Sequence, residues 1–187
     1  MNEIRDSKKE IMFIRVDNDG ENEILQRDCI RDKMGIKFEY TSRITTKHNG
    51  VVERKYQTLY NRLRATLNES TLDSKNKGKL WGECAFCVTN LENICVDEPN
   101  KKSPYEIFYG RKCKIVNDLR KFGEIGVVKV EYDGMVSKLK NKGKSMMMCG
   151  YSLNHSKGVY RMYDFDTEKI CISRDIKWLG LMYKDCN

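Results

Sequence analysis

The pattern of apolar residues changes between residues 111 and 119, and this change restricts the folds that the chain can adopt. Before it, long segments carry apolar side chains at helical spacing; after it, short apolar runs alternate with Gly, Asn and Asp turns. Evenly spaced short strands of this kind are typical of a small antiparallel sheet or barrel. The sequence therefore predicts an α/β part at residues 1–115 and a small antiparallel β-barrel at residues 120–182.

The first part contains two predicted strands among longer helices. The opening apolar run is predicted to be a buried strand. Gly35 is expected to end the first helix, and Ser103 and Pro104 to begin the last one as its N-cap and first helical residue. The predicted strands are residues 11–16 and 36–41, and the predicted helices are residues 22–34, 49–67, 76–94 and a short segment from 104 onward.

The second part contains four predicted strands, separated by segments rich in Gly, Asn and Asp. Three consecutive methionines at residues 146–148 are interpreted as strand residues that fill the core, because thioether side chains adapt to irregular gaps. The predicted strands cover residues 122–130, 145–151, 159–163 and 169–173.

Asp17 and Glu53 form a candidate catalytic and metal-binding pair. Asp17 ends the first predicted strand and Glu53 lies in the first turns of a long predicted helix, with 35 residues between them. A strand-end Asp and a helix-borne Glu can converge on one cation, and hard divalent ions such as Mg²⁺ take oxygen ligands. The spacing alone also allows a coincidental pair, because the chain has 27 acidic residues.

Ordered sequence blocks surround both carboxylates. The first reads Val-Asp-Asn-Asp-Gly-Glu from residue 16, and another reads Asn-Gly-Val-Val-Glu-Arg-Lys from residue 49. Further blocks lie at residues 35–42, 80–83, 102–106, 119–123, 150–152 and 173–175. In order and separation, these blocks resemble the integrase core of copia-type retrotransposon polyproteins, from about residue 11 to residue 179.

The resemblance implies a polynucleotidyl transferase with a partial RNase H-like integrase core, followed by a Src-homology-3-like barrel. In it, Asp17 matches the second Asp of the family's catalytic triad and Glu53 matches the Glu, both as ligands of Mg²⁺ or Mn²⁺. The family's first Asp lies on the opening strand of the sheet, upstream of Met1. We therefore expect the metal to bind weakly or not at all, and the chain to lack catalytic activity on its own.

The sequence departs from the family pattern close to both candidate carboxylates and in residues 42–48, where the family usually has a Pro-containing stretch. Asp19 stands where the family usually has Gly, so strain is expected there if the backbone requires positive φ. Gln57 stands where a basic residue is typical. These departures favour a decayed or fragmentary copy.

The long helix predicted at residues 49–67 combines an apolar stripe with a polar face. The polar face would look toward nucleic acid. The stripe consists of Val52, Leu59, Leu63 and Leu67, and the neighbouring face of Glu53, Gln57, Tyr60 and Arg64.

Basic clusters indicate an anionic partner, since the net charge is +8. Contacts to phosphates would give sequence-independent, salt-sensitive DNA binding, although a charge run is also typical of a solvated loop. The candidate nucleic-acid-binding residues are Lys47, Arg54, Lys55, Gln57, Tyr60, Arg64, Lys138, Lys140, Lys142 and Lys144.

The eight cysteines are interpreted as reduced thiols that fill the core, because no secretory signal opens the chain. Cys84 and Cys87 are spaced like half of a zinc site, but the sequence has no second Cys or His pair to complete it. This favours a core role. No apolar run is long enough to span a membrane. An intracellular protein, cytoplasmic or nuclear, is expected.

Two classes of function remain open. One is a remnant integrase core that binds DNA and other integrase chains; the alternative is a non-catalytic interaction or assembly module centred on the C-terminal barrel. A third hypothesis is an active integrase completed by a separate upstream chain.

Overall fold

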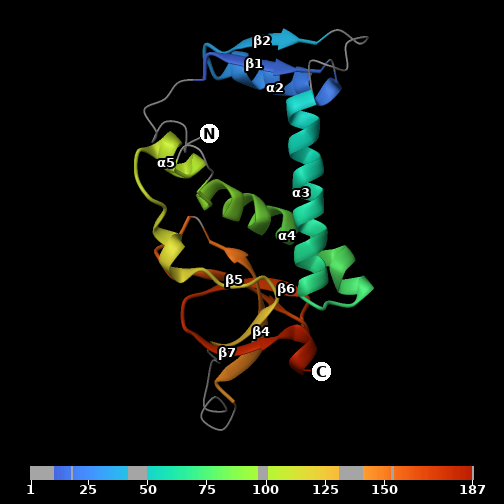
Figure 1. The fold of residues 1–187 in the computed structure, drawn as a ribbon, viewed down its shortest axis with the longest axis vertical. Helices are drawn as coiled ribbons and strands as arrows, with labels where there is room; N and C mark the ends of the chain where they lie inside the picture. The colour runs from blue at the N-terminus through green and yellow to red at the C-terminus, as the bar shows by residue number, and fades with distance from the viewer. Residues whose placement is uncertain are drawn as a thin grey trace.

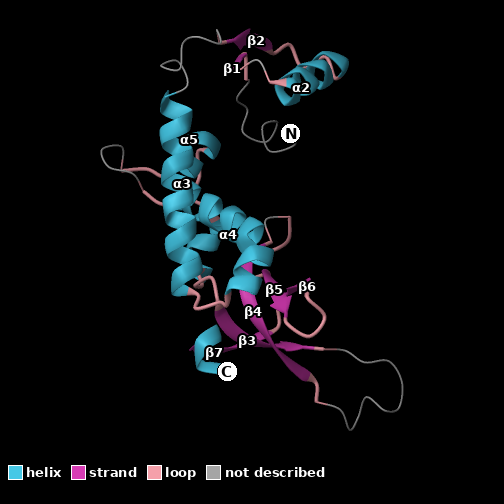
Figure 2. Ribbon diagram, turned by 90° about the vertical axis from the view of Figure 1, so that its right-hand side faces the viewer, coloured by secondary structure: helices cyan, strands magenta, loops and turns pink. Residues whose placement is uncertain are grey.

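The computed structural model describes residues 11–17, 19–41, 50–96, 101–130, 141–152 and 154–186. A small unit of β1 (Phe13–Val16), α2 (Gly20–Arg31) and β2 (Lys37–Tyr40) lies at one end of the molecule (Figure 1). A five-stranded sheet lies at the other end, and α3 (Gly50–Glu69) and α4 (Ser74–Ile94) lie between them. The same arrangement is visible from the side in Figure 2.

The N-terminal unit is buried on one face only. β1 and β2 pair in parallel, and the Tyr40 hydroxyl donates a hydrogen bond of 2.7 Å to Gln26 of α2. Because side chains alternate along a strand, Ile14 and Val16 are half-buried while Phe13 is 57% exposed. The prediction of a strand is confirmed here, but the prediction that it is buried is wrong.

Asp19 is the N-cap of α2 and has φ −94°, an ordinary extended conformation. Its carbonyl oxygen accepts hydrogen bonds from the amides of Asn22 and Glu23, at 2.9 and 3.3 Å. The expected strain at this position is therefore wrong, since the φ angle of Asp19 is negative. Positive φ occurs instead at Gly35, after the helix.

The three following helices begin and end close to their predicted positions. Asp73 caps α4 by accepting a hydrogen bond from the amide of Asn76. α5 (Pro104–Tyr109) begins with a capping box in which Ser103 and Glu106 each accept a hydrogen bond of 3.1 Å from the other's amide. Within the described residues, no helix is both long and apolar enough to cross a membrane.

Five antiparallel strands form the C-terminal sheet in the order β6-β5-β4-β3-β7. β7 follows β6 in the chain but pairs with β3 at the opposite edge. It is absent from the predicted strands because only Arg174 and Asp175 separate it from β6, without a Gly- or Asn-rich turn. The strands are β3 (Glu124–Lys129), β4 (Gly143–Tyr151), β5 (Tyr160–Asp164), β6 (Lys169–Ser173) and β7 (Ile176–Met182).

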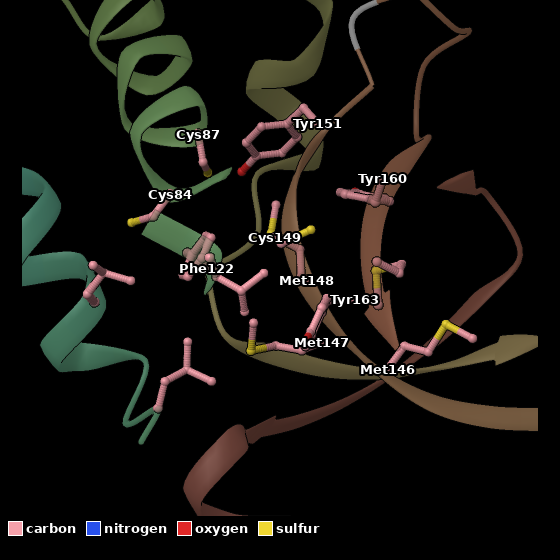
Figure 3. Packing of buried hydrophobic residues seen from close by; sticks show 14 of the residues in the cluster. Cys84, Cys87, Phe122, Met146, Met147, Met148, Cys149, Tyr151, Tyr160 and Tyr163 are labelled. Atoms are coloured by element: carbon pink, nitrogen blue, oxygen red, sulfur yellow. The ribbon is translucent and has the colours of Figure 1, made fainter. Parts of the chain in front are cut away.

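One hydrophobic core joins the helices to the sheet. Cys84 and Cys87 of α4 and Met147 and Met148 of β4 are all 0% exposed and belong to the same cluster. Figure 3 shows the two α4 cysteines near the strand that carries the methionines, with Phe122 in the same group. The predicted role of the methionines and of these two cysteines as core residues agrees with this packing.

A bidentate ion pair also connects α4 to the sheet. The Arg161 guanidinium donates to both carboxylate oxygens of Glu83, at 2.7 and 2.9 Å, and both side chains are mostly buried. The fold class, an α/β part followed by a small antiparallel β part, is confirmed. The predicted division into residues 1–115 and 120–182 stays a prediction, and one core crosses it.

Candidate nucleic-acid interface and metal-binding residues

Asp17 directly follows β1 and is held by the first turn of α2. The side-chain amide of Asn22 donates a hydrogen bond of 2.5 Å to its carboxylate and one of 3.2 Å to its carbonyl oxygen. Glu53 lies in the first turn of α3, where its side chain is exposed. Both carboxylates are therefore accessible to solvent, and the orientation of Asp17 is fixed by a neutral donor.

The chemistry of these two side chains suits a hard divalent cation, because both offer carboxylate oxygens. Among the residues that the structure describes, no group of three or more His, Cys, Asp or Glu side chains could hold a metal ion. A shared cation between Asp17 and Glu53 therefore stays a prediction.

The polar face of α3 is exposed along its length. Glu53, Gln57, Tyr60 and Arg64 are all exposed, with Tyr60 at 57%. Their spacing of four, three and four residues places them on one side of the helix. This side is open to a partner from the first turn of α3 to its fourth.

The apolar stripe of α3 is buried only in its C-terminal half. Leu63 and Leu67 are buried and Leu59 is half-buried. Val52, at the N-terminal end of the stripe, is 52% exposed. The reason is that α4 crosses the C-terminal half of α3, as Figure 1 shows.

The basic residues of α3 divide into two groups. Lys55 and Arg62 reach Glu92 of α4 at 2.7 and 2.9 Å, and the Glu92 side chain is only 6% exposed. These two cations hold the helices together. Arg54 and Arg64 are exposed on α3 and are better placed for phosphates. Sequence reasoning missed the role of Arg62, although it lies seven residues from Lys55 on the same helix face.

The lysines near the start of β4 also differ in their surroundings. Lys142 is exposed, whereas the Lys144 ammonium lies 2.7 Å from Asp164 and 3.0 Å from Asp166. Hydrogen bonds to these two carboxylates raise the pKa of Lys144. Lys144 therefore links β4 to β5 and the turn after it. The candidates Lys47, Lys138 and Lys140 lie outside the described residues.

Burial makes the core thiols unreactive. It raises the pKa of Cys84 to about 12, and burial with the nearby Glu83 charge raises the pKa of Cys87 to about 12. The thiolate is the form that attacks electrophiles and binds metals. At neutral pH, both side chains therefore behave as small apolar groups.

Iodoacetamide is expected to label Cys95 rapidly and Cys84 and Cys87 only after unfolding. Cys95 is exposed, whereas the other two are fully buried, and at about pH 8 little thiolate forms when the pKa is raised this far. Peptide mapping by mass spectrometry, with and without denaturant, measures the difference. Labelling of Cys84 at the rate of Cys95 in the native protein would contradict the packing.

Comparisons with known proteins identify the C-terminal part. The family model described as the retroviral polymerase SH3-like domain matches residues 127–184, which extend from β3 to the last helical turn. A solved structure of the simian T-cell lymphotropic virus intasome, in complex with the PP2A regulatory subunit B56 gamma, is also similar. That likeness covers 90% of this chain and 55% of the other, at 12% identity and a TM-score of 0.39.

A relative from tobacco covers almost the whole chain. The retrovirus-related Pol polyprotein from transposon TNT 1-94 of Nicotiana tabacum is 26% identical over 172 residues, or 92% of this chain. The chain spans 12% of the length of that polyprotein. Together, the SH3-like domain and this relationship support the resemblance of the chain to copia-type retrotransposon polyproteins.

Proposed function

We propose that this chain is a DNA-binding region of a retrotransposon integrase. The observation that carries the proposal is the exposed face of α3, where Gln57, Tyr60 and Arg64 follow Glu53 along one side. In this proposal, β1, α2, β2 and α3 are part of an RNase H-like core, and other integrase chains are partners in the assembly. The match of residues 127–184 to the retroviral polymerase SH3-like domain supports the proposal.

Arg54 and Arg64 are the residues that would bind the DNA backbone. Their guanidinium groups can each donate two hydrogen bonds to a phosphate. Lys142, exposed directly before β4, would add a further contact. Lys55 and Lys144 are less available for phosphates, because their ammonium groups already pair with Glu92 and with Asp164.

Asp17 and Glu53 are the proposed ligands of Mg²⁺ or Mn²⁺. Such an ion, when bound, stabilises the charge that develops on oxygens during phosphoryl transfer. Asn22 would keep the Asp17 carboxylate in one orientation through its 2.5 Å hydrogen bond. Glu53 would lie one turn before Gln57, so that the metal shares one side of α3 with Gln57 and Arg64.

Duplex DNA is expected to bind with micromolar or weaker affinity that falls steeply with salt. For about three phosphate contacts, affinity should drop roughly 10- to 100-fold between about 50 and 200 mM salt. Arg54→Gln and Arg64→Gln should each weaken binding and lower the salt slope by about one. Fluorescence anisotropy with a labelled random-sequence duplex measures both quantities.

The matched control for these variants is Arg174→Gln, an exposed arginine next to β7. It removes the same charge from a different surface, so its salt slope should remain that of the unaltered protein. Equal losses for Arg174→Gln and Arg64→Gln would point to net charge alone. An affinity that does not change with salt would refute the proposed phosphate contacts.

The 187-residue polypeptide is expected to show no strand-transfer activity by itself. Asp17 and Glu53 supply two carboxylates, whereas a two-metal site needs further ligands to hold both ions about 3.5–4 Å apart. Labelled donor DNA ends incubated with Mn²⁺ provide the assay. Product above the level formed by the Glu53→Gln variant would contradict this expectation.

A further inference from the structure

Three adjoining cavities form a groove beside α5. Their volumes are about 330, 400 and 400 Å³. The first two share Tyr105 and Tyr109, and the second and third share Tyr151 and His155. We name this surface the α5 groove; it runs from the end of α4, past α5, to the turn between β4 and β5.

Two aromatic rings line the α5 groove. Tyr105 and Tyr109 are one helical turn apart on α5, with ring centroids 4.4 Å apart and planes inclined at 37°. Both side chains are only half-buried. Rings of this kind can stack against the flat face of a nucleobase, which is a contact that every base can make.

Positive charge surrounds these rings. Arg111 and Lys114 are exposed and line the second cavity. From residue 101 to residue 117, the chain carries five basic residues and one acidic residue, Glu106. Glu106 is engaged in the capping box with Ser103. The nearby Asp118 carboxylate lies 3.4 Å from the Lys157 ammonium, which offsets its charge. The groove is therefore suited to an anionic ligand.

A polar side chain adds hydrogen-bonding capacity to the α5 groove. Asn90 of α4 lines the first and third cavities. Its side-chain amide nitrogen is buried and has no hydrogen-bond partner within the described part of the chain. Amide side chains can pair with the edges of bases. The Asn90 side chain thus places an unused hydrogen-bond donor next to the aromatic rings.

We propose that the α5 groove binds single-stranded nucleic acid, with bases stacked on Tyr105 and Tyr109 and phosphates held by Arg111 and Lys114. A cavity of about 330 Å³ can hold an unstacked base with its sugar, whereas bases within a duplex are stacked on each other and cannot enter it. An acidic peptide would satisfy the basic residues but offers no flat base to stack against the exposed parts of the rings. The groove is separate from the exposed face of α3 and does not depend on the duplex binding proposed there.

The test compares an oligothymidine of about 12 nucleotides with an abasic oligomer of the same length, by fluorescence anisotropy. The oligothymidine should bind the unaltered protein at least tenfold more tightly than the abasic oligomer does, because only the former can stack. The Tyr105→Leu/Tyr109→Leu double variant keeps apolar bulk without the rings. It should bind the oligothymidine about tenfold more weakly, to about the level of the abasic oligomer.

The control variant is Tyr56→Leu, which removes an exposed ring from α3 and should leave oligothymidine binding unchanged.

Equal binding of the abasic oligomer would overturn the proposal, as would an unaltered affinity in the double variant. Competition by poly-glutamate as strong as that by oligothymidine would show a peptide site instead. If the double variant fails to fold, as judged by circular dichroism, the abasic comparison with the unaltered protein decides alone. Duplex binding, measured in parallel with Arg64→Gln, separates failure here from failure of the α3 interface.

Discussion

Replacement of Gly123 by alanine is expected to lower the free energy of unfolding by about 3 kcal/mol, because it combines backbone strain with a steric collision. Gly123 has φ +94°, and an added Cβ would lie 2.8 Å from the Cβ and 3.0 Å from the Cα of Ser70. Ser70 is fully buried after the end of α3. The backbone of Gly123 is fixed on both sides, by hydrogen bonds of 2.9 Å to Met148 and 3.1 Å from Tyr183.

The matched control is Gly180→Ala in β7. Gly180 also has positive φ, at +69°, but no atom lies within 4 Å of the position that an added Cβ would occupy, so only the backbone cost of about 1 kcal/mol applies. Urea denaturation of both variants separates the collision from the strain. Equal losses of stability would mean that Ser70 moves aside freely and that the end of α3 is not packed tightly on the sheet.

Local structure is predictable from the sequence wherever a short-range signal decides it. Ser103 and Pro104 begin α5 as predicted, and Glu106 completes a capping box that depends only on residues three apart. The first four strands of the sheet lie within a few residues of their predicted positions, because apolar runs and turn residues mark them. β7 lacks such a turn and is absent from the prediction.

Tertiary contacts are less predictable, because periodicity identifies the buried face of an element but not its partner. The sequence indicates that Cys84 and Cys87 are core residues, yet nothing in their spacing indicates that they share a core with Met147 and Met148. The exposure of Val52 has the same origin. It depends on where α4 crosses α3, which is a property of the whole fold.

In the candidate site, too, local features are predictable from the sequence and tertiary contacts are not. The exposed face of Glu53, Gln57 and Tyr60 follows directly from helical spacing and is predicted by it. Lys144 resembles its neighbours in a lysine-rich segment, and only the fold brings Asp164 to its ammonium. The α5 groove is absent from the sequence-based prediction, although a pair of tyrosines four residues apart, followed by basic residues at 111, 112 and 114, is a signal that the sequence contains.

Truncation of Leu80 to alanine is expected to destabilise the helices and the sheet together. Leu80 of α4 is 2% exposed and belongs to the core that also contains Phe122 and Met147. Removing its buried methyl groups should cost about 2–5 kcal/mol, depending on how far the cavity collapses. Because one core crosses the boundary, amide exchange in β4 and β5 should accelerate by the same factor as exchange in α4.

Leu119→Ala is the matched control for this variant, because Leu119 is 44% exposed. Its truncation should lower the free energy of unfolding much less than Leu80→Ala does. Hydrogen exchange followed by mass spectrometry resolves α4, β4 and β5 as separate peptides. If Leu80→Ala accelerates exchange in α4 but leaves β4 protected, residues 120–182 fold without the helices. Parallel acceleration would instead make the α3–α4 pair part of the folding unit, because the sheet loses its cover over Met147 and Met148 whenever α4 detaches.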